Sequence, residues 1–80
     1  MIVLVNYTME SFELKVDQRT YKVIQSAIGK TTVFSVFNHS SFHTITKVGA
    51  DCWEVVEHRF GNHKIPLQII GKRIDDYFGL

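Results

Sequence analysis

Residues 31–58 decide the fold, and they read TTVFSVFNHSSFHTITKVGADCWEVVEH. This stretch holds three segments rich in β-branched and aromatic side chains, which favour strands. The segments are residues 31–37, 42–47 and 52–58. Short polar sequences separate them, NHSS at 38–41 and VGAD at 48–51, and both are typical of turns. Because parallel strands need a long crossover between them, connections this short predict an antiparallel meander.

The meander extends toward the N-terminus through one more hairpin. Residues 12–16 alternate apolar and polar side chains, which is the pattern of a half-buried strand. Residues 17–19 supply a turn, and residues 21–24 form the returning strand. Residues 1–8 are open to two interpretations: a dispensable N-terminal extension, or an edge strand that pairs near residues 12–16.

The periodicity becomes helical after Arg59. Apolar residues recur at helical spacing at Leu67, Ile70, Ile74 and Phe78. Pro66 suits the first turn of a helix, where its missing N–H is not needed, so the spacing predicts a helix over 66–78. Gly71 lies on the apolar stripe, where a glycine costs ~1 kcal/mol of helix propensity, and we therefore expect the helix to approach the sheet closely there. Gly79 resembles a C-terminal cap.

The predicted fold class is α+β, with one domain over residues 1–80. An antiparallel β-meander of four to six strands occupies residues 10–58, and one C-terminal α-helix, residues 66–78, packs on one face of the sheet. A chain of 80 residues is long enough for a single domain. Its 45% apolar and 21% charged residues are ordinary for a globular protein and exclude intrinsic disorder.

Charge and targeting signals exclude several classes of partner. Nine Lys and Arg against eight Asp and Glu leave a net charge of +1, which gives no argument for nucleic acid or an anionic membrane. No stretch approaches the ~20 apolar residues that span a bilayer, and the first residues lack the pattern of a signal peptide. A single cysteine is typical of a reducing compartment. We therefore expect a cytoplasmic protein without a nucleic-acid or membrane partner.

The predicted registers leave the sheet apolar on both faces. A three-residue loop at 49–51 sets Ile45 opposite Val55, and the turn at 38–41 sets Phe37 opposite Phe42. One face then carries Phe34, Val36, Ile45, Trp53 and Val55. The opposite face carries Val33, Phe37, Phe42 and Val56. A half-solvated antiparallel sheet is expected to be polar on one side, so this second apolar face needs a cover.

Three covers are possible, because the single helix shelters only one face: residues 1–8 folding across the sheet, a second copy of the chain, or a different partner or ligand. Two-fold homodimers are the commonest soluble oligomers. We therefore expect a small intracellular, non-enzymatic interaction module, a homodimer that buries the second face, with another protein as the alternative partner. The expected interface residues are Val33, Phe37, Phe42 and Val56.

The alternative function depends on His43 and Glu57, which the predicted register places opposite each other. A carboxylate beside an imidazole fixes the orientation of the ring, and such pairs perform general acid–base catalysis when they lie beside a substrate cavity. Cross-strand pairs of this kind are also common as structural features. The alternative is a small-molecule-binding protein or enzyme with the His43/Glu57 pair beside a pocket at the sheet face.

The remaining candidates predict no cofactor and no metal. Cys52, His58 and His63 match no closed zinc pattern in their spacing. Six residues of strand separate Cys52 from His58 by about 20 Å, which is too far for a nucleophile and its base. The sequence Gly-Lys-Thr at 29–31 lacks the earlier glycine of a phosphate-binding loop, because that position is Ile24.

Two further expectations concern the aspartates of the helix and the surroundings of Trp53. Asp75 and Asp76 are expected on the solvated face of the helix, since adjacent helical residues do not converge on one atom. Trp53 is expected in the core with the aliphatic part of Lys47 beside it, and a cation–π contact between these two side chains is the alternative.

Overall fold

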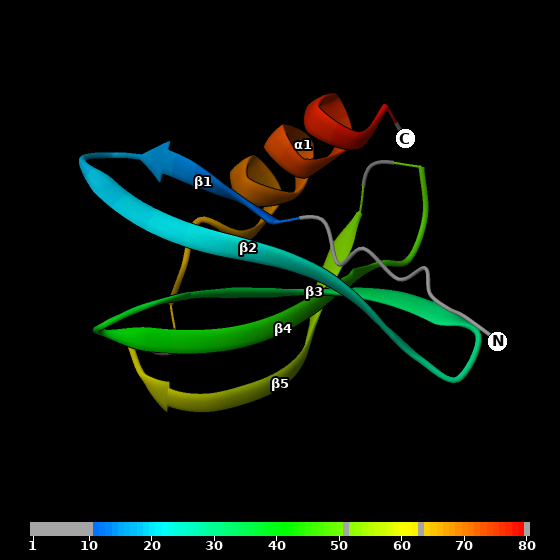
Figure 1. Cartoon of the computed structure of the whole chain (residues 1–80), viewed down its shortest axis with the longest axis horizontal. Coiled ribbons are helices and arrows are strands. Elements are labelled where there is room, and N and C mark those ends of the chain that lie inside the picture. The colour runs from blue at the N-terminus through cyan, green and yellow to red at the C-terminus, as the bar shows by residue number, and fades with distance from the viewer. Residues whose placement is uncertain (1–10, 51, 63, 80) are drawn as a thin grey trace, which may run out of the picture.

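Five antiparallel strands stand in the sheet in the order of the sequence, and one helix follows them (Figure 1). These elements belong to residues 11–50, 52–62 and 64–79, which the computed structural model describes. The strands are β1 (Ser11–Val16), β2 (Arg19–Ile28), β3 (Thr31–Asn38), β4 (Ser41–Lys47) and β5 (Trp53–Gly61), and the helix is α1 (Leu67–Phe78). The predicted α+β class is confirmed. Both interpretations of residues 1–8 lie outside the described residues.

β2 is longer than the sequence predicts, because it continues past Ile24 to Ile28. The extra residues include glutamine, serine and alanine, which have little preference for strands. They are extended because they pair with β3, from Gln25 opposite Phe34 to Ile28 opposite Thr31. Pairing with a neighbouring strand overrides local preference in this segment.

Local turn chemistry joins the strands as expected. Asp17 and Gln18 adopt positive φ angles of 50° and 66°, the conformation of a two-residue hairpin turn that matches the twist of the flanking strands. In the β3–β4 turn, Asn38 Oδ1 accepts hydrogen bonds from the backbone N–H groups of Ser40, at 2.8 Å, and Ser41, at 3.1 Å. A short polar side chain therefore orders this turn.

Most of the predicted registers around β4 are confirmed, but the predicted pairing of His43 with Glu57 is not. The confirmed registers pair Phe34 with Ile45, Phe37 with Phe42, Ile45 with Val55 and Lys47 with Trp53. β5 then departs from regular alternation, since Val56 and Arg59 have no partner in β4. Each is a β-bulge, which inserts one extra residue and shifts the pairing by one position. After the first bulge, each side chain of β5 lies on the face of the sheet opposite to the one that simple alternation predicts. The second bulge restores the predicted alternation.

The core lies between α1 and the face of the sheet that the helix covers. Its buried members are Leu14, Val16, Tyr21, Val23, Phe34, Val36, Ile45, Trp53, Ile70 and Ile74. α1 contacts both β1 and β5, the first and last strands, so the sheet curls around the helix (Figure 1). Val55, expected on this face, is an exception because 41% of it is exposed.

The helix lies directly on Trp53 at Gly71. A Cβ atom at position 71 would overlap Cδ1, Cγ and Nε1 of the indole, so the two elements approach this closely only because the residue is glycine. The predicted close approach is confirmed. One turn earlier, Gln68 Oε1 accepts a hydrogen bond from the Trp53 N–H, and Gln68 Nε2 donates one to the Trp53 carbonyl, both at 3.1 Å. The predicted cap at Gly79 is also confirmed, with φ of 70° and a 2.8 Å bond from its N–H to the Asp75 carbonyl.

The expectation that Asp75 is solvated is wrong. Its Oδ1 lies 3.0 Å from Nζ of Lys47, and this ion pair joins α1 to β4. Asp76 is exposed, as expected. The Lys47 ammonium therefore pairs with a carboxylate, while the Trp53 ring is buried in the core.

Candidate functional site

The four expected interface residues differ in exposure. Val33 is only 3% exposed, whereas Phe37 and Phe42 are partly buried and Val56 is 50% exposed. Val33 is thus already removed from solvent and has almost no surface to offer a partner. Phe37 and Phe42 lie on the side of the sheet opposite α1, which we call the outer face.

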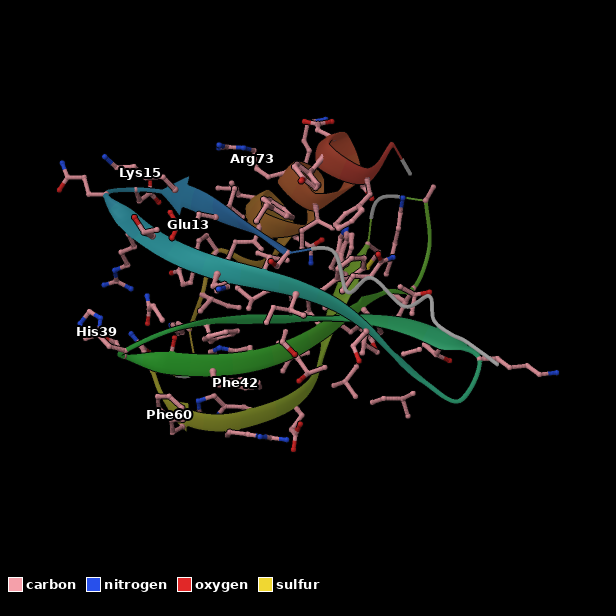
Figure 2. All side chains as sticks on the ribbon, viewed as in Figure 1. Glu13, Lys15, His39, Phe42, Phe60 and Arg73 are labelled. Atoms are coloured by element: carbon pink, nitrogen blue, oxygen red, sulfur yellow. The ribbon has the colours of Figure 1, made fainter. Side chains whose placement is uncertain are left out.

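Three aromatic rings cross the outer face from β3 to β5. Phe37 stacks on Phe42 with ring centroids 5.3 Å apart, and the Phe60 centroid lies 6.4 Å from that of Phe42. Phe42 and Phe60 are labelled in Figure 2. The guanidinium carbon of Arg59 lies 4.9 Å from the Phe42 centroid. The second bulge explains this arrangement, because it lets two successive side chains of β5 reach the same ring. We call Phe37, Phe42 and Phe60 the aromatic row.

Phe60 is not among the residues that the sequence predicts at this surface. The predicted strand ends at His58, whereas β5 continues to Gly61. The sequence nevertheless indicates the position of Phe60, because alternation counted from Val56 places both side chains on the same side of the strand. The two bulges cancel beyond position 59, so simple alternation predicts this residue correctly.

Charged groups flank the aromatic row on β5. Glu57 Oε1 accepts a 3.5 Å hydrogen bond from Thr44 Oγ1, and Glu57 Oε2 lies 3.4 Å from Nε of Arg59. Both charged side chains are at least half exposed, so this ion pair contributes little to the stability of the fold. It does place a negative and a positive group beside the rings.

Charges also flank the other end of the row, on β1 and β2 of the same face. Glu13 of β1 faces Lys22 of β2 in the register, and both line a shallow groove of about 430 Å³ together with Phe37. Among the residues that the structure describes, neither Glu13 nor Lys22 forms an ion pair. Both charges therefore remain available to a partner.

The predicted pairing of His43 with Glu57 is wrong. The bulge at Val56 shifts the register, so Glu57 faces Thr44 and His43 faces His58. His43 is 1% exposed on the helix side of the sheet, whereas Glu57 lies on the outer face. These two side chains therefore form no acid–base pair beside a pocket.

The two histidines lie together instead. Their ring centroids are 4.6 Å apart, and His58 Nε2 lies 3.0 Å from the Gly61 carbonyl oxygen. Because that oxygen only accepts, Nε2 donates in this contact. The pair is an internal part of the sheet rather than a group presented to solvent.

A second concavity, a cleft of about 450 Å³, opens where the β1–β2 turn, the β3–β4 turn and the segment after β5 meet. It is lined mainly by polar side chains and by the two cations Arg19 and Lys64. No candidate from the sequence lies here, because its residues are far apart in the chain and share no motif. Only the fold brings them together.

Within the described parts of the chain, no three His, Cys, Asp or Glu side chains gather where they could hold a metal ion. Cys52 is a free, exposed thiol. The helix that the structure describes is too short to cross a membrane.

Comparison of the chain with family models, curated proteins and solved structures finds no match. Function is therefore inferred from the geometry of the two surfaces, the outer face and the cleft.

Proposed function

We propose that this chain is a cytoplasmic, non-enzymatic interaction module that forms a homodimer through its outer face. The aromatic row is the observation that carries the proposal. Phe60 remains 48% exposed although it packs beside Phe42. Large apolar groups gathered on one surface of a small domain mark a site of association more often than scattered exposed residues do.

The free energy of burial sets the expected strength of the dimer. Complete burial of a large apolar side chain contributes about 1.5–3 kcal/mol. Phe60 is about half exposed and the other two rings are less exposed, so finishing the burial of the aromatic row in both protomers contributes roughly 2–7 kcal/mol. Association costs about 4–15 kcal/mol in lost rigid-body freedom and ordering. The rings alone therefore support at most a weak, concentration-dependent dimer, and the flanking charges contribute mainly to the choice of partner.

The charges favour a second copy over an unrelated protein. A two-fold axis that lies parallel to β3 in the interface places β5 of one protomer over β1 and β2 of the other. Such an axis keeps the level of each residue along the strands, and the register sets Phe60 level with Glu13, so Arg59 approaches Glu13 of the second copy. Opposite signs meet at both ends of the row, which is the self-complementarity that a two-fold interface requires.

The oligomeric state tests the proposal. Sedimentation velocity over a wide range of concentrations is expected to show a monomer–dimer equilibrium for the full chain. Phe60→Asp is expected to shift the chain to monomer, because a charge replaces a ring at the exposed end of the row. Ile69→Asp is the matched control, since Ile69 is 52% exposed on α1, away from the outer face; this variant is expected to keep the dimer.

Several results would overturn the proposal. They are a full chain that stays monomeric at the highest concentration, a dimer that Phe60→Asp leaves intact, and equal loss of the dimer in both variants. A monomer that dimerises only after residues 1–8 are removed would show that these residues cover the face. A monomer that binds a different protein through Phe60 would show a heterologous partner.

A further inference from the structure

The cleft at the turn end of the sheet adjoins the groove on the outer face, and the two share Thr20, Asn38 and His39 in their linings. Tyr21 and Ser41, which line it, lie on the helix side of β2 and β4. His39, in the β3–β4 turn, marks this end of the molecule in Figure 2. The cleft volume of about 450 Å³ falls within the range of small-molecule sites, which runs over roughly 300–1,000 Å³. A ligand in the cleft would therefore bind beside the proposed dimer interface, on the helix side of the strands.

Two largely buried residues contribute hydroxyl groups to the cleft wall. Tyr21 is 1% exposed and Ser41 is 4% exposed, yet both line the cleft. Neither hydroxyl hydrogen-bonds to another residue of the described chain. Neither oxygen is among the described buried side-chain atoms that lack a partner, so both hydroxyls reach the solvent in the cleft. These two hydroxyls are therefore available to hydrogen-bond to a molecule that enters the cleft.

The charged side chains that line the cleft are positive. Arg19 and Lys64 contribute cations, and the described lining residues include no carboxylate. Neither cation forms an ion pair within the described chain. A guanidinium presents a planar set of donors that matches carboxylate and phosphate oxygens. The cleft thus combines unused positive charge with unused hydroxyl groups.

Hydrogen bonds order the walls around these groups. Asn38 Nδ2 donates to the Thr20 carbonyl at 3.3 Å, which links the β3–β4 turn to the start of β2. Asn62 Oδ1 accepts a 3.0 Å hydrogen bond from the Lys64 N–H, which shapes the segment after β5. The three segments around the cleft are therefore held by their own side chains rather than by a ligand.

We propose that this cleft binds a small organic anion that carries a carboxylate or phosphate group. Arg19 and Lys64 pair with the anionic group, and the Tyr21 and Ser41 hydroxyls bond to the part of the ligand that enters most deeply. Carboxylate and phosphate groups both accept hydrogen bonds from these cations and hydroxyls, and the experiment below distinguishes the two groups.

Titrations of the full chain followed by amide NMR test the proposal. Inorganic phosphate and citrate are the two anionic probes, glucose is the neutral probe, and ionic strength is held constant. We expect saturable shifts of the Thr20 and Ser41 amides with at least one anion and none with glucose. The anion that binds more tightly identifies the preferred group.

Variants assign the binding to the named side chains. Arg19→Gln and Lys64→Gln are each expected to weaken binding about tenfold, the effect of losing one charge-assisted hydrogen bond. Tyr21→Phe is expected to weaken it while keeping the packing of the ring. Lys30→Gln is the matched control, because Lys30 lies in the β2–β3 turn at the other end of the sheet, and it is expected to have no effect.

Three outcomes would overturn the proposal. They are the absence of saturation with both anions, an equal loss of affinity in Lys30→Gln and Arg19→Gln, and binding of glucose as tight as that of either anion. The unchanged amide spectrum of each variant serves as the check on folding.

Discussion

Gly71 of α1 lies flat against the indole ring of Trp53 at the start of β5, with no room between them for a Cβ atom. The contact explains why a helix of this length tolerates a residue that weakens helices. It also fixes the depth at which α1 sits on the sheet. Because the ring is 2% exposed and enclosed by the core, it has little freedom to move aside.

We therefore predict that Gly71→Ala destabilises the protein. The substitution gains about 1 kcal/mol of helix propensity, but inserting a methyl group into a filled site costs typically 1–3 kcal/mol, and more where backbone must shift. Because the methyl group would overlap a buried ring, its cost lies at the upper end of that range, and we expect a net loss of about 2 kcal/mol in the free energy of unfolding, measured by urea denaturation. Gly49→Ala is the control, because the nearest atom to a Cβ there is at the ordinary distance of 3.9 Å. Stabilisation by Gly71→Ala would contradict the contact.

A second prediction concerns Gln68, whose side-chain amide bonds both backbone groups of Trp53. Gln68→Ala removes two hydrogen bonds, each worth about 0.5–1.5 kcal/mol. Gln68→Glu keeps the acceptor but turns a carboxylate oxygen toward the Trp53 carbonyl, so we expect it to destabilise the fold at least as much as alanine does. Thermal unfolding at neutral pH measures both, with exposed Lys72→Ala on the same helix as the control. Wild-type stability in Gln68→Glu would show that the donated hydrogen bond is unimportant.

A third prediction follows from the corrected register. Because Glu57 and His43 lie on opposite faces of the sheet, Glu57→Gln is expected to leave the ring resonances of His43 unchanged in NMR spectra. His58→Gln is expected to shift them, since the two imidazole centroids are 4.6 Å apart. A shift of the His43 resonances in Glu57→Gln as large as that in His58→Gln would restore the pairing that the structure excludes.

A fourth prediction tests the arrangement of the proposed dimer through its charges. Arg59→Glu is expected to weaken dimerisation, because it brings two negative groups together where the axis sets Arg59 near Glu13 of the second copy. Adding Glu13→Lys reverses both signs and is expected to recover the dimer. Sedimentation velocity at low salt measures both, since salt screens exposed charges. Additive weakening in the double variant would rule out this axis.

The sequence predicts the class, the strand order and the pairing of β4 next to its two turns, because these follow from hydrophobic alternation and turn residues that are local in the chain. It also predicts the contact at Gly71, because a glycine on the apolar stripe of a helix weakens the helix unless a close neighbour requires it there. These correct predictions share one property: the deciding residues are neighbours in the sequence.

The wrong predictions have a different cause. Val56 and Arg59 carry no local mark of a bulge, so alternation places His43 and Glu57 together although the register separates them. The pairing of Asp75 with Lys47 joins residues that are 28 positions apart, and no pattern within either segment indicates it. The cleft escapes prediction for the same reason, because three distant segments form it.

β5 is one of the two outermost strands in the described sheet, where exposed backbone groups offer a template on which another chain can add as a strand. At Trp53 the side-chain amide of Gln68 already occupies both backbone groups, and further along, Val56 and Arg59 interrupt the regular ladder. An incoming strand would therefore find no uninterrupted run of donors and acceptors along β5. This side of the molecule is protected against fibril-like growth, and crowded solutions of the protein are expected to remain free of cross-β aggregates seeded there.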